Sequence, residues 1–399
     1  MRIAMMMRAI DQNSGHSPII EGMVDTMLRI DNENTYLLLY RTAKKMGQFS
    51  DFPNANEQLV QAPHTLLWDQ VAVPYVAWKR RADIIYNPKF SVPLMSHCPV
   101  VMGLQEPAWW AWPEHYEWFD RNYMKLMLPI YMRKSRHLFP ISQFVIDETK
   151  RYVKFPFENK ATVVYPGPKT YFHPIEDVSV LENFRHRHKL PERFVLTVTR
   201  VDHPGLDNST SFYPGKNVET TVRAFIKCRP NIPHSLVVHG RNVRNYLLHV
   251  GFKDAEFERI HFSEFIPNHE DMPTLFNLAD LFVLASFYES YATPLVEAMA
   301  CGCPSLASKT AAMPEITAGA ALLADPYDPA DFADKMELVL SNDDVRTNLR
   351  SRALQRARFF NWERAARLLI DVMTRVRQER PKTLSHVSEH ACISREGKE

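Results

Sequence analysis

The sequence predicts an α/β protein built from two halves, each a parallel sheet with helices on both faces. The chain has 399 residues, and a single hydrophobic core rarely grows past roughly 250–300 residues. Short apolar runs alternate with amphipathic stretches in two successive series, a pattern typical of parallel sheets covered on both sides. Between the series lies the proline-containing polar segment 166–191, which we interpret as the link.

The first series occupies residues 1–170. We expect its strands at 1–7, 36–40, 99–104, 137–141 and 162–165, and helices at 19–30 and 143–152. The second series occupies residues 191–361. We expect strands at 194–199, 236–239, 281–285, 304–307 and 321–323, and helices at 217–228, 242–250, 294–300, 330–340 and 344–359. A last helix at 362–377 precedes a polar, aperiodic tail at 380–399, which we expect to be disordered.

Composition excludes several classes of protein. The formal net charge is +2 and the chain has only 12 glycines, so neither a general nucleic-acid footprint nor glycine-rich phosphate loops are indicated. No G-x-G-x-x-G fingerprint and no P-loop is present, which argues against a dehydrogenase and a P-loop enzyme. The five cysteines have no zinc-ligand spacing, and no D-x-D pair occurs. We therefore expect no metal and no cofactor.

Neither a secretory leader nor an 18-residue apolar run is visible, so we expect a cytoplasmic protein, with the inner face of the membrane as an alternative.

The richest segment follows the strand predicted at 281–285. Glu289 stands at the strand end, and Glu297 lies one turn into the next helix. Thr293 suits the N-cap of that helix and Pro294 its first turn. Because a helix N-terminus attracts phosphate and carboxylates accept bonds from sugar hydroxyls, the segment favours a sugar-nucleotide site. Its expected donor-binding residues are Glu297, Ser290, Tyr291, Ala292, Thr293, Pro294 and Leu295.

This stretch resembles the Glu-x7-Glu signature of retaining glycosyltransferase family 4, whose context is E-G-F-G-x-P-x-L-E-A-M-A-C-G-x-P. Glu289 and Glu297 match its two glutamates. The resemblance implies the GT-B fold: two Rossmann-like doubly wound domains that face a central cleft. The N-terminal domain would bind the acceptor, the C-terminal domain the nucleotide sugar, and helix 362–377 would return to the N-terminal domain.

Other family positions follow from the same resemblance. Arg200 and Lys216 match the cations that approach the donor diphosphate, so together with Glu289 they are the expected catalytic residues. The insert 201–214 between them is longer than the usual turn. Gly240 matches a position of close backbone approach, and Phe265 one near the nucleobase.

The first half resembles the family only weakly. Gly15 remains from the family's glycine loop, so the resemblance implies that it binds the donor, with an ordinary turn as the alternative. Gln105-Glu106 replaces the usual His-Asp after the strand at 99–104, and the Gln105 amide is a candidate substitute for the histidine.

Two further segments leave alternatives open. Residues 108–119 hold four tryptophans, which suit sugar stacking, a membrane interface or plain core packing. Residues 121–137 interleave basic and apolar side chains, which favours either contact with an anionic membrane or a solvated helix.

The expected reaction is transfer of a hexosyl group, best matched to mannose from GDP-mannose, to a hydroxyl of a glycan or lipid-linked sugar in surface polysaccharide assembly. The alternatives are a nucleotide-sugar-binding or catalytically impaired protein of this fold, and a sugar-phosphate synthase or epimerase. The partners implied are a nucleotide sugar, the acceptor and the membrane surface, with no nucleic acid.

Overall fold

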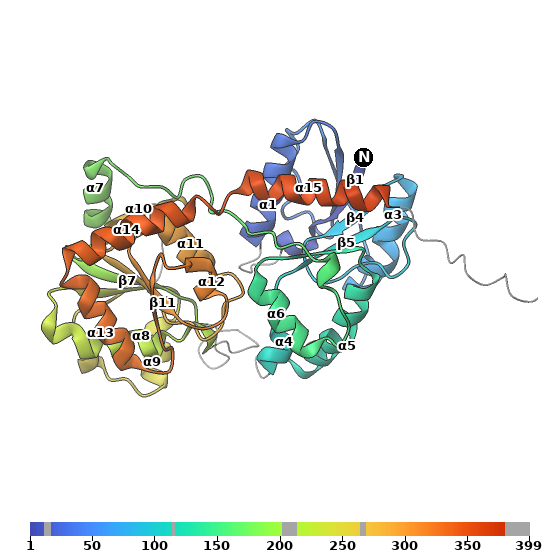
Figure 1. The fold of residues 1–399 in the computed structure, drawn as a ribbon. Helices are drawn as coiled ribbons and strands as arrows, with labels where there is room; N and C mark the ends of the chain where they lie inside the picture. Colours follow the sequence, from blue (N-terminus) through green and yellow to red (C-terminus); the bar gives the residue numbers. More distant parts are fainter. Residues whose placement is uncertain (12–16, 114–115, 202–213, 264–268, 380–399) are drawn as a thin grey trace, which may run out of the picture.

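The computed structural model describes residues 1–11, 17–113, 116–201, 214–263 and 269–379. These residues form two six-stranded sheets in which every pairing is parallel, with helices on both faces of each sheet (Figure 1). The predicted fold class is therefore confirmed. We refer to the part built on the first sheet as the N-terminal half and to the part built on the second as the C-terminal half.

The first sheet has the strand order β3-β2-β1-β4-β5-β6. Its strands are β1 (Arg2–Met6), β2 (Thr35–Tyr40), β3 (Ala55–Leu59), β4 (Ile84–Asn87), β5 (Val100–Leu104) and β6 (His137–Pro140). The sequence analysis missed β3 and β4. Edge strand β3 reads ANEQL and is half-exposed, so it lacks an apolar run. The strand predicted at 162–165 is wrong: this segment only donates hydrogen bonds from Thr162 and Val164 to carbonyls of β6.

Helices cover both faces of this sheet. They are α1 (Ser17–Ile30), α2 (Thr65–Leu67), α3 (Val73–Lys79), α4 (Ala108–Ala111), α5 (Trp118–Lys134) and α6 (Gln143–Tyr152). Helix α1 buries Ile20, Met23, Val24, Met27 and Leu28 at spacings of three and four residues, as an amphipathic helix on a sheet does. Ser142 caps α6, because its hydroxyl oxygen accepts a bond from the Val145 amide.

The second sheet has the strand order β12-β11-β10-β7-β8-β9. Its strands are β7 (Phe194–Val198), β8 (Ser235–His239), β9 (Ile260–Ser263), β10 (Leu281–Leu284), β11 (Ser305–Ser308) and β12 (Leu322–Ala324). Its helices are α8 (Val218–Cys228), α9 (Val243–His249), α10 (Met272–Leu278), α11 (Thr293–Ala300), α12 (Met313–Thr317), α13 (Pro329–Leu340) and α14 (Asp343–Ala357). The link also contains a helix that the sequence analysis did not expect, α7 (Val178–His188).

The last helix, α15 (Trp362–Gln378), lies along α1 of the N-terminal half (Figure 1). Two glycines make room for its first residue. A Cβ at Gly22 would lie 2.8 Å from the Trp362 ring, and one at Gly167 would lie 2.9 Å from it. The indole therefore fixes the start of α15 against α1 and the beginning of the link.

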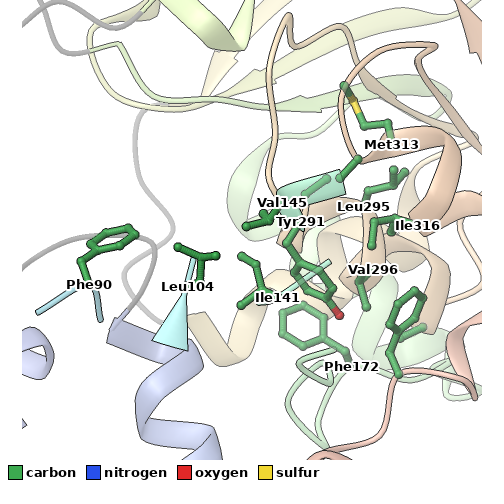
Figure 2. Packing of buried hydrophobic residues seen from close by; sticks show 14 of the residues in the cluster. Phe90, Leu104, Ile141, Val145, Phe172, Tyr291, Leu295, Val296, Met313 and Ile316 are labelled. Carbon is green, nitrogen blue, oxygen red and sulfur yellow. The ribbon is translucent and has the colours of Figure 1, made fainter. Parts of the chain in front are cut away.

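One hydrophobic cluster runs through both halves. It contains Ile141 and Val145 from the N-terminal half and Tyr291, Leu295 and Val296 from the C-terminal half, as Figure 2 shows. Burial of apolar surface is the main stabilising contribution to folding, so this shared core holds the carboxyl ends of the two sheets together at the place where the predicted site lies.

Candidate active site

An ion pair joins the two segments that the sequence analysis put at the centre of the site. Nζ of Lys216 donates to Oε1 of Glu289 at 2.7 Å, and the hydroxyl of Ser286 donates to the same oxygen at 2.8 Å. The side chains of Glu289 and Lys216 are 12% and 26% exposed. The pair is thus half-buried and still open to a ligand.

Backbone contacts fix this pair in place. Asn217, directly after Lys216, has a left-handed backbone (φ 48°), which asparagine tolerates better than most residues. The side-chain amide of Asn217 donates to the backbone carbonyls of Ala285 and Pro326, which follow β10 and β12. The amide of Phe287 donates to Gly215 at 2.8 Å. The turn before α8 and the loop after β10 therefore form one rigid unit.

The loop after Glu289 reaches α11 through an unusual residue. Ala292 has a left-handed backbone (φ 60°) and occupies the N-cap, while Thr293 is already the first helical residue. The expected capping by Thr293 is therefore wrong. Pro294 stands at the second helical position, where its missing N–H costs nothing. Tyr291 and Leu295 are buried in the shared core.

Glu297 is the fifth residue of α11 and is buried. Burial raises the pKa of its carboxyl to about 8, and the cation of Lys169 only partly opposes this. Its Oε1 lies 3.8 Å from Nε2 of His269, and Nδ1 of His269 lies 2.8 Å from the Tyr171 hydroxyl. Two of the polar neighbours of Glu297, Lys169 and Tyr171, therefore come from the link. The polar sequence of the link gave no sign that these residues lie beside the site.

Arg200 and Gly240 follow the neighbouring strands β7 and β8. Gly240 has a φ of +157°, and a Cβ there would lie 2.0 Å from the carbonyl oxygen of Thr199. Only glycine fits, because the turn that carries Arg200 is pressed against it. Arg200 itself is exposed. Gly15, Phe265 and positions 202–213 of the insert lie outside the described residues.

In the N-terminal half, Gln105 turns inward. Its Nε2 donates to the carbonyl of Pro88 at 2.8 Å, and the residue is 3% exposed. Its neighbour Glu106, which the sequence analysis did not count among the site residues, has more contacts that point to a site. It accepts a hydrogen bond from the Tyr116 hydroxyl, and burial raises the pKa of its carboxyl.

Glu106 also brings charge from the N-terminal half toward the central ion pair. Lys89 lies close enough to lower its pKa, and burial in turn lowers the pKa of Lys89 to about 8. Across the junction, Glu289 raises the pKa of Glu106 and Lys216 lowers it. Two acidic and two basic side chains from both halves therefore interact at this place. Glu289 and Lys216 were found through the motif resemblance, and Glu106 follows a predicted strand. Lys89 follows β4, which was not predicted, so the sequence carried no signal for it.

The tryptophan segment has divided roles. Trp109 is buried, Trp110 stacks on Tyr152, and Trp112 stacks on Phe287 of the C-terminal half at 6.1 Å between ring centroids. Trp118 is 71% exposed. Core packing, contact between the halves and surface exposure thus all occur within one short segment.

Across the part of the chain that the structure describes, no cluster of three or more His, Cys, Asp or Glu side chains could hold a metal ion. Over the same residues, every helix is too short or too polar to cross a bilayer.

Comparisons with known proteins fit this arrangement. Residues 208–356 match the family model described as Glycosyl transferases group 1. The chain is 24% identical over 264 residues to the serotype-specific mannosyltransferase WbdA of Escherichia coli, a match that covers 65% of this chain and 31% of that protein. It is 25% identical over 299 residues to the O-antigen chain mannosyltransferase B of Escherichia coli, covering 72% and 74% respectively.

A solved glycosyltransferase structure from Rickettsia africae ESF-5 superposes with a TM-score of 0.70 at 13% identity, covering 94% of this chain and 98% of that one. This likeness shows the shared fold. The chain spans about a third of the length of the WbdA relatives. The two parallel sheets therefore have the GT-B architecture, and the match to the glycosyl transferases group 1 model lies in the C-terminal half.

Proposed function

We propose that this protein transfers a mannosyl group from GDP-mannose to a hydroxyl of a glycan or lipid-linked sugar, with retention at the anomeric carbon, as a family 4 glycosyltransferase in surface polysaccharide assembly. The observation that carries the proposal is the Lys216–Glu289 ion pair, held between two strand ends beside the start of α11. The mannosyltransferase names of the relatives WbdA and O-antigen chain mannosyltransferase B support the choice of sugar.

In this reaction the bond from the anomeric carbon to the diphosphate oxygen breaks, and a bond to the acceptor oxygen forms. The acceptor proton passes to the departing diphosphate. Arg200, Lys216 and the N-terminus of α11 would stabilise the charge that develops on that diphosphate. An ammonium has three N–H donors, so Lys216 can serve Glu289 and a phosphate oxygen at once.

The two glutamates have different chemistry. Glu289 is ion-paired and its side chain is 12% exposed, so its carboxylate is suited to accept bonds from donor-sugar hydroxyls near the anomeric centre. One of its oxygens already accepts from both Lys216 and Ser286, which fits a binding role rather than a covalent nucleophile. Buried Glu297, with its pKa raised to about 8, stays protonated at neutral pH, and a neutral carboxyl can both donate to and accept from a ribose diol.

The acceptor would enter from the N-terminal half, where Glu106 and Lys89 approach the ion pair. Positively charged and apolar side chains of α5 support membrane contact there: Trp118 and Leu126 are 71% and 67% exposed, and Arg133 and Lys134 are exposed at its end. The stretch from the start of α2 to the end of α3 also exposes Leu67, Val71, Tyr75 and Trp78. Such a surface suits an anionic bilayer that carries a lipid-linked acceptor.

The test is release of nucleoside diphosphate from GDP-mannose, UDP-glucose and UDP-N-acetylglucosamine, each with lipid-linked and soluble glycan acceptors. We expect GDP release from GDP-mannose, insensitivity to EDTA, and an α-linked product by NMR. No release from any donor would refute catalysis, and GDP binding without turnover would instead indicate a sugar-nucleotide-binding protein. An inverted anomer would refute retention.

A further inference from the structure

A carboxylate of the C-terminal half binds the start of a helix in the N-terminal half. Glu315 of α12 accepts hydrogen bonds from two successive backbone amides of α6: Oε1 from Gln143 at 2.7 Å and Oε2 from Phe144 at 2.8 Å. Oε1 also accepts from the Tyr165 hydroxyl at 2.7 Å. Three charge-assisted bonds therefore cross the junction to one side chain.

The partner of this carboxylate is well suited to it. The first amides of an α-helix have no partner within the helix, and its N-terminus carries partial positive charge. Ser142 satisfies only the Val145 amide. Glu315 fills the two amides before it, as an acidic N-terminal side chain would do, although it belongs to the other half.

The same helix start touches the loop of the central ion pair. The Ser142 hydroxyl donates to the carbonyl of Ser290 at 2.6 Å, one residue after Glu289. From the other side, the amide of Ala312 donates to the carbonyl of Glu289 at 3.1 Å. The backbone around Glu289 is thus bounded by α6 of one half and by the start of α12, which carries Glu315.

Glu315 is itself held in place. The guanidinium of Arg356 donates to the carbonyls of Glu315 and Ile316, both at 2.8 Å, and lies over the rings of Phe359 and Phe360 at 4.5 and 4.9 Å. These contacts fix the backbone of α12 at the point where the chain returns to the N-terminal half.

We propose that Glu315 is a positioning residue for the transfer step: by binding the start of α6 it sets the N-terminal half, with Glu106, in register with the Lys216–Glu289 pair. This inference rests on the proposed function. A positioning role predicts that nucleotide affinity and the rate of transfer respond differently to loss of Glu315, whereas a merely structural role would change both together. On the proposed function, the residues expected at the diphosphate and the ribose, Arg200, Lys216 and Glu297, all belong to the C-terminal half. Acceptor attack would in addition require both halves to be aligned, and a misplacement of about 1 Å can cost roughly 100-fold in rate.

The test compares E315Q with Y165F, which removes one of the three bonds, and with E363Q, a control at an exposed ion pair on α15. Three quantities are measured: GDP affinity by calorimetry, kcat and acceptor KM for mannosyl transfer, and amide hydrogen exchange at Gln143 and Phe144. For E315Q we expect unchanged GDP affinity, a roughly 10- to 100-fold fall in kcat, and faster exchange at both amides. Y165F should lie between E315Q and the wild type, and E363Q should match the wild type.

The exchange measurement needs no turnover, so it tests the contact even if the chain transfers no mannose. Unchanged exchange in E315Q overturns the contact. Faster exchange with wild-type kcat, or a fall in GDP affinity that parallels the fall in kcat, overturns the positioning role.

Discussion

Lys216 and Glu289 lie 73 positions apart in the sequence, yet their side chains meet at 2.7 Å because the turn before α8 and the loop after β10 are bonded to each other. The pair unites a cation suited to phosphate with a carboxylate suited to sugar hydroxyls. Replacing Lys216 and replacing Glu289 should therefore have different effects on nucleotide binding and on transfer.

We expect K216A to weaken GDP binding and to lower kcat by about 100- to 1000-fold, the usual effect of removing one group that stabilises developing charge. E289Q should lose transfer to a similar extent but bind GDP as the wild type does. Calorimetry and diphosphate release distinguish the two. K335A, which breaks an ion pair on α13, is the matched control. Wild-type turnover in K216A would show that Lys216 takes no part in the reaction.

Burial of Glu297 makes stability depend on pH. The folded protein keeps the proton up to a pKa of about 8, whereas the unfolded chain releases it near 4.5. Because the folded state binds more protons between these values, its free energy of unfolding falls as pH rises, by up to about 1.4 kcal/mol per pH unit.

E297Q removes this dependence, so its stability relative to the wild type should increase from pH 5 to pH 8 and then level off. Urea unfolding at several pH values measures this. The exposed E363Q variant should show a flat difference from the wild type over the same range. A flat difference for E297Q as well would mean that Glu297 is ionised in the folded protein.

Two neighbouring alanines before α12 differ in backbone strain. Ala311 has a left-handed φ of 53°, which costs an L-residue about 1 kcal/mol or more, whereas Ala312 has an ordinary φ of −78° and is fully buried. A311G should therefore raise the free energy of unfolding by about 1 kcal/mol. A312G should lower the free energy of unfolding by about 1–2 kcal/mol, because the folded state loses a buried methyl and the unfolded chain gains backbone entropy. Equal signs for the two variants would contradict this account.

The exposed apolar side chains of α5 predict binding to anionic vesicles. L126E places a carboxylate where an apolar side chain is 67% exposed, and should reduce co-sedimentation with phosphatidylglycerol-containing vesicles several-fold. L338E is the matched control, since Leu338 is 47% exposed on the C-terminal half. If both variants bind like the wild type, α5 does not contact the bilayer.

Local patterns were enough to predict most of the fold. Most strands with apolar runs and the helix at 143–152 follow from periodicity, although the short strands β4 and β9 were missed. Glu289 and Glu297 lie within one contiguous motif. Polar segments were harder, because β3 and α7 form from residues that are half-exposed and give no apolar signal. Ala292 also misled the prediction of the N-cap, since alanine normally favours the right-handed helix.

The junction could not be predicted from the sequence for a different reason. Glu315 accepts a bond from Gln143, 172 positions away in the sequence. Glu106 interacts electrostatically with Glu289, which belongs to the other half. From the neighbouring sequence alone, each of these side chains would be predicted to be an ordinary surface carboxylate. Only the relative placement of the two sheets shows that it faces a partner.

The chain passes between the halves twice, and the two passages touch. Gly167 lies against Trp362, and the ring of Tyr165 packs on Phe359 at 5.2 Å and on Phe360 at 6.1 Å. Because the two connections lie side by side, any rotation of one half against the other would have to bend both of them at this one place. One pair of spectroscopic probes, placed on the two halves on the side away from these connections, would therefore report such a rotation.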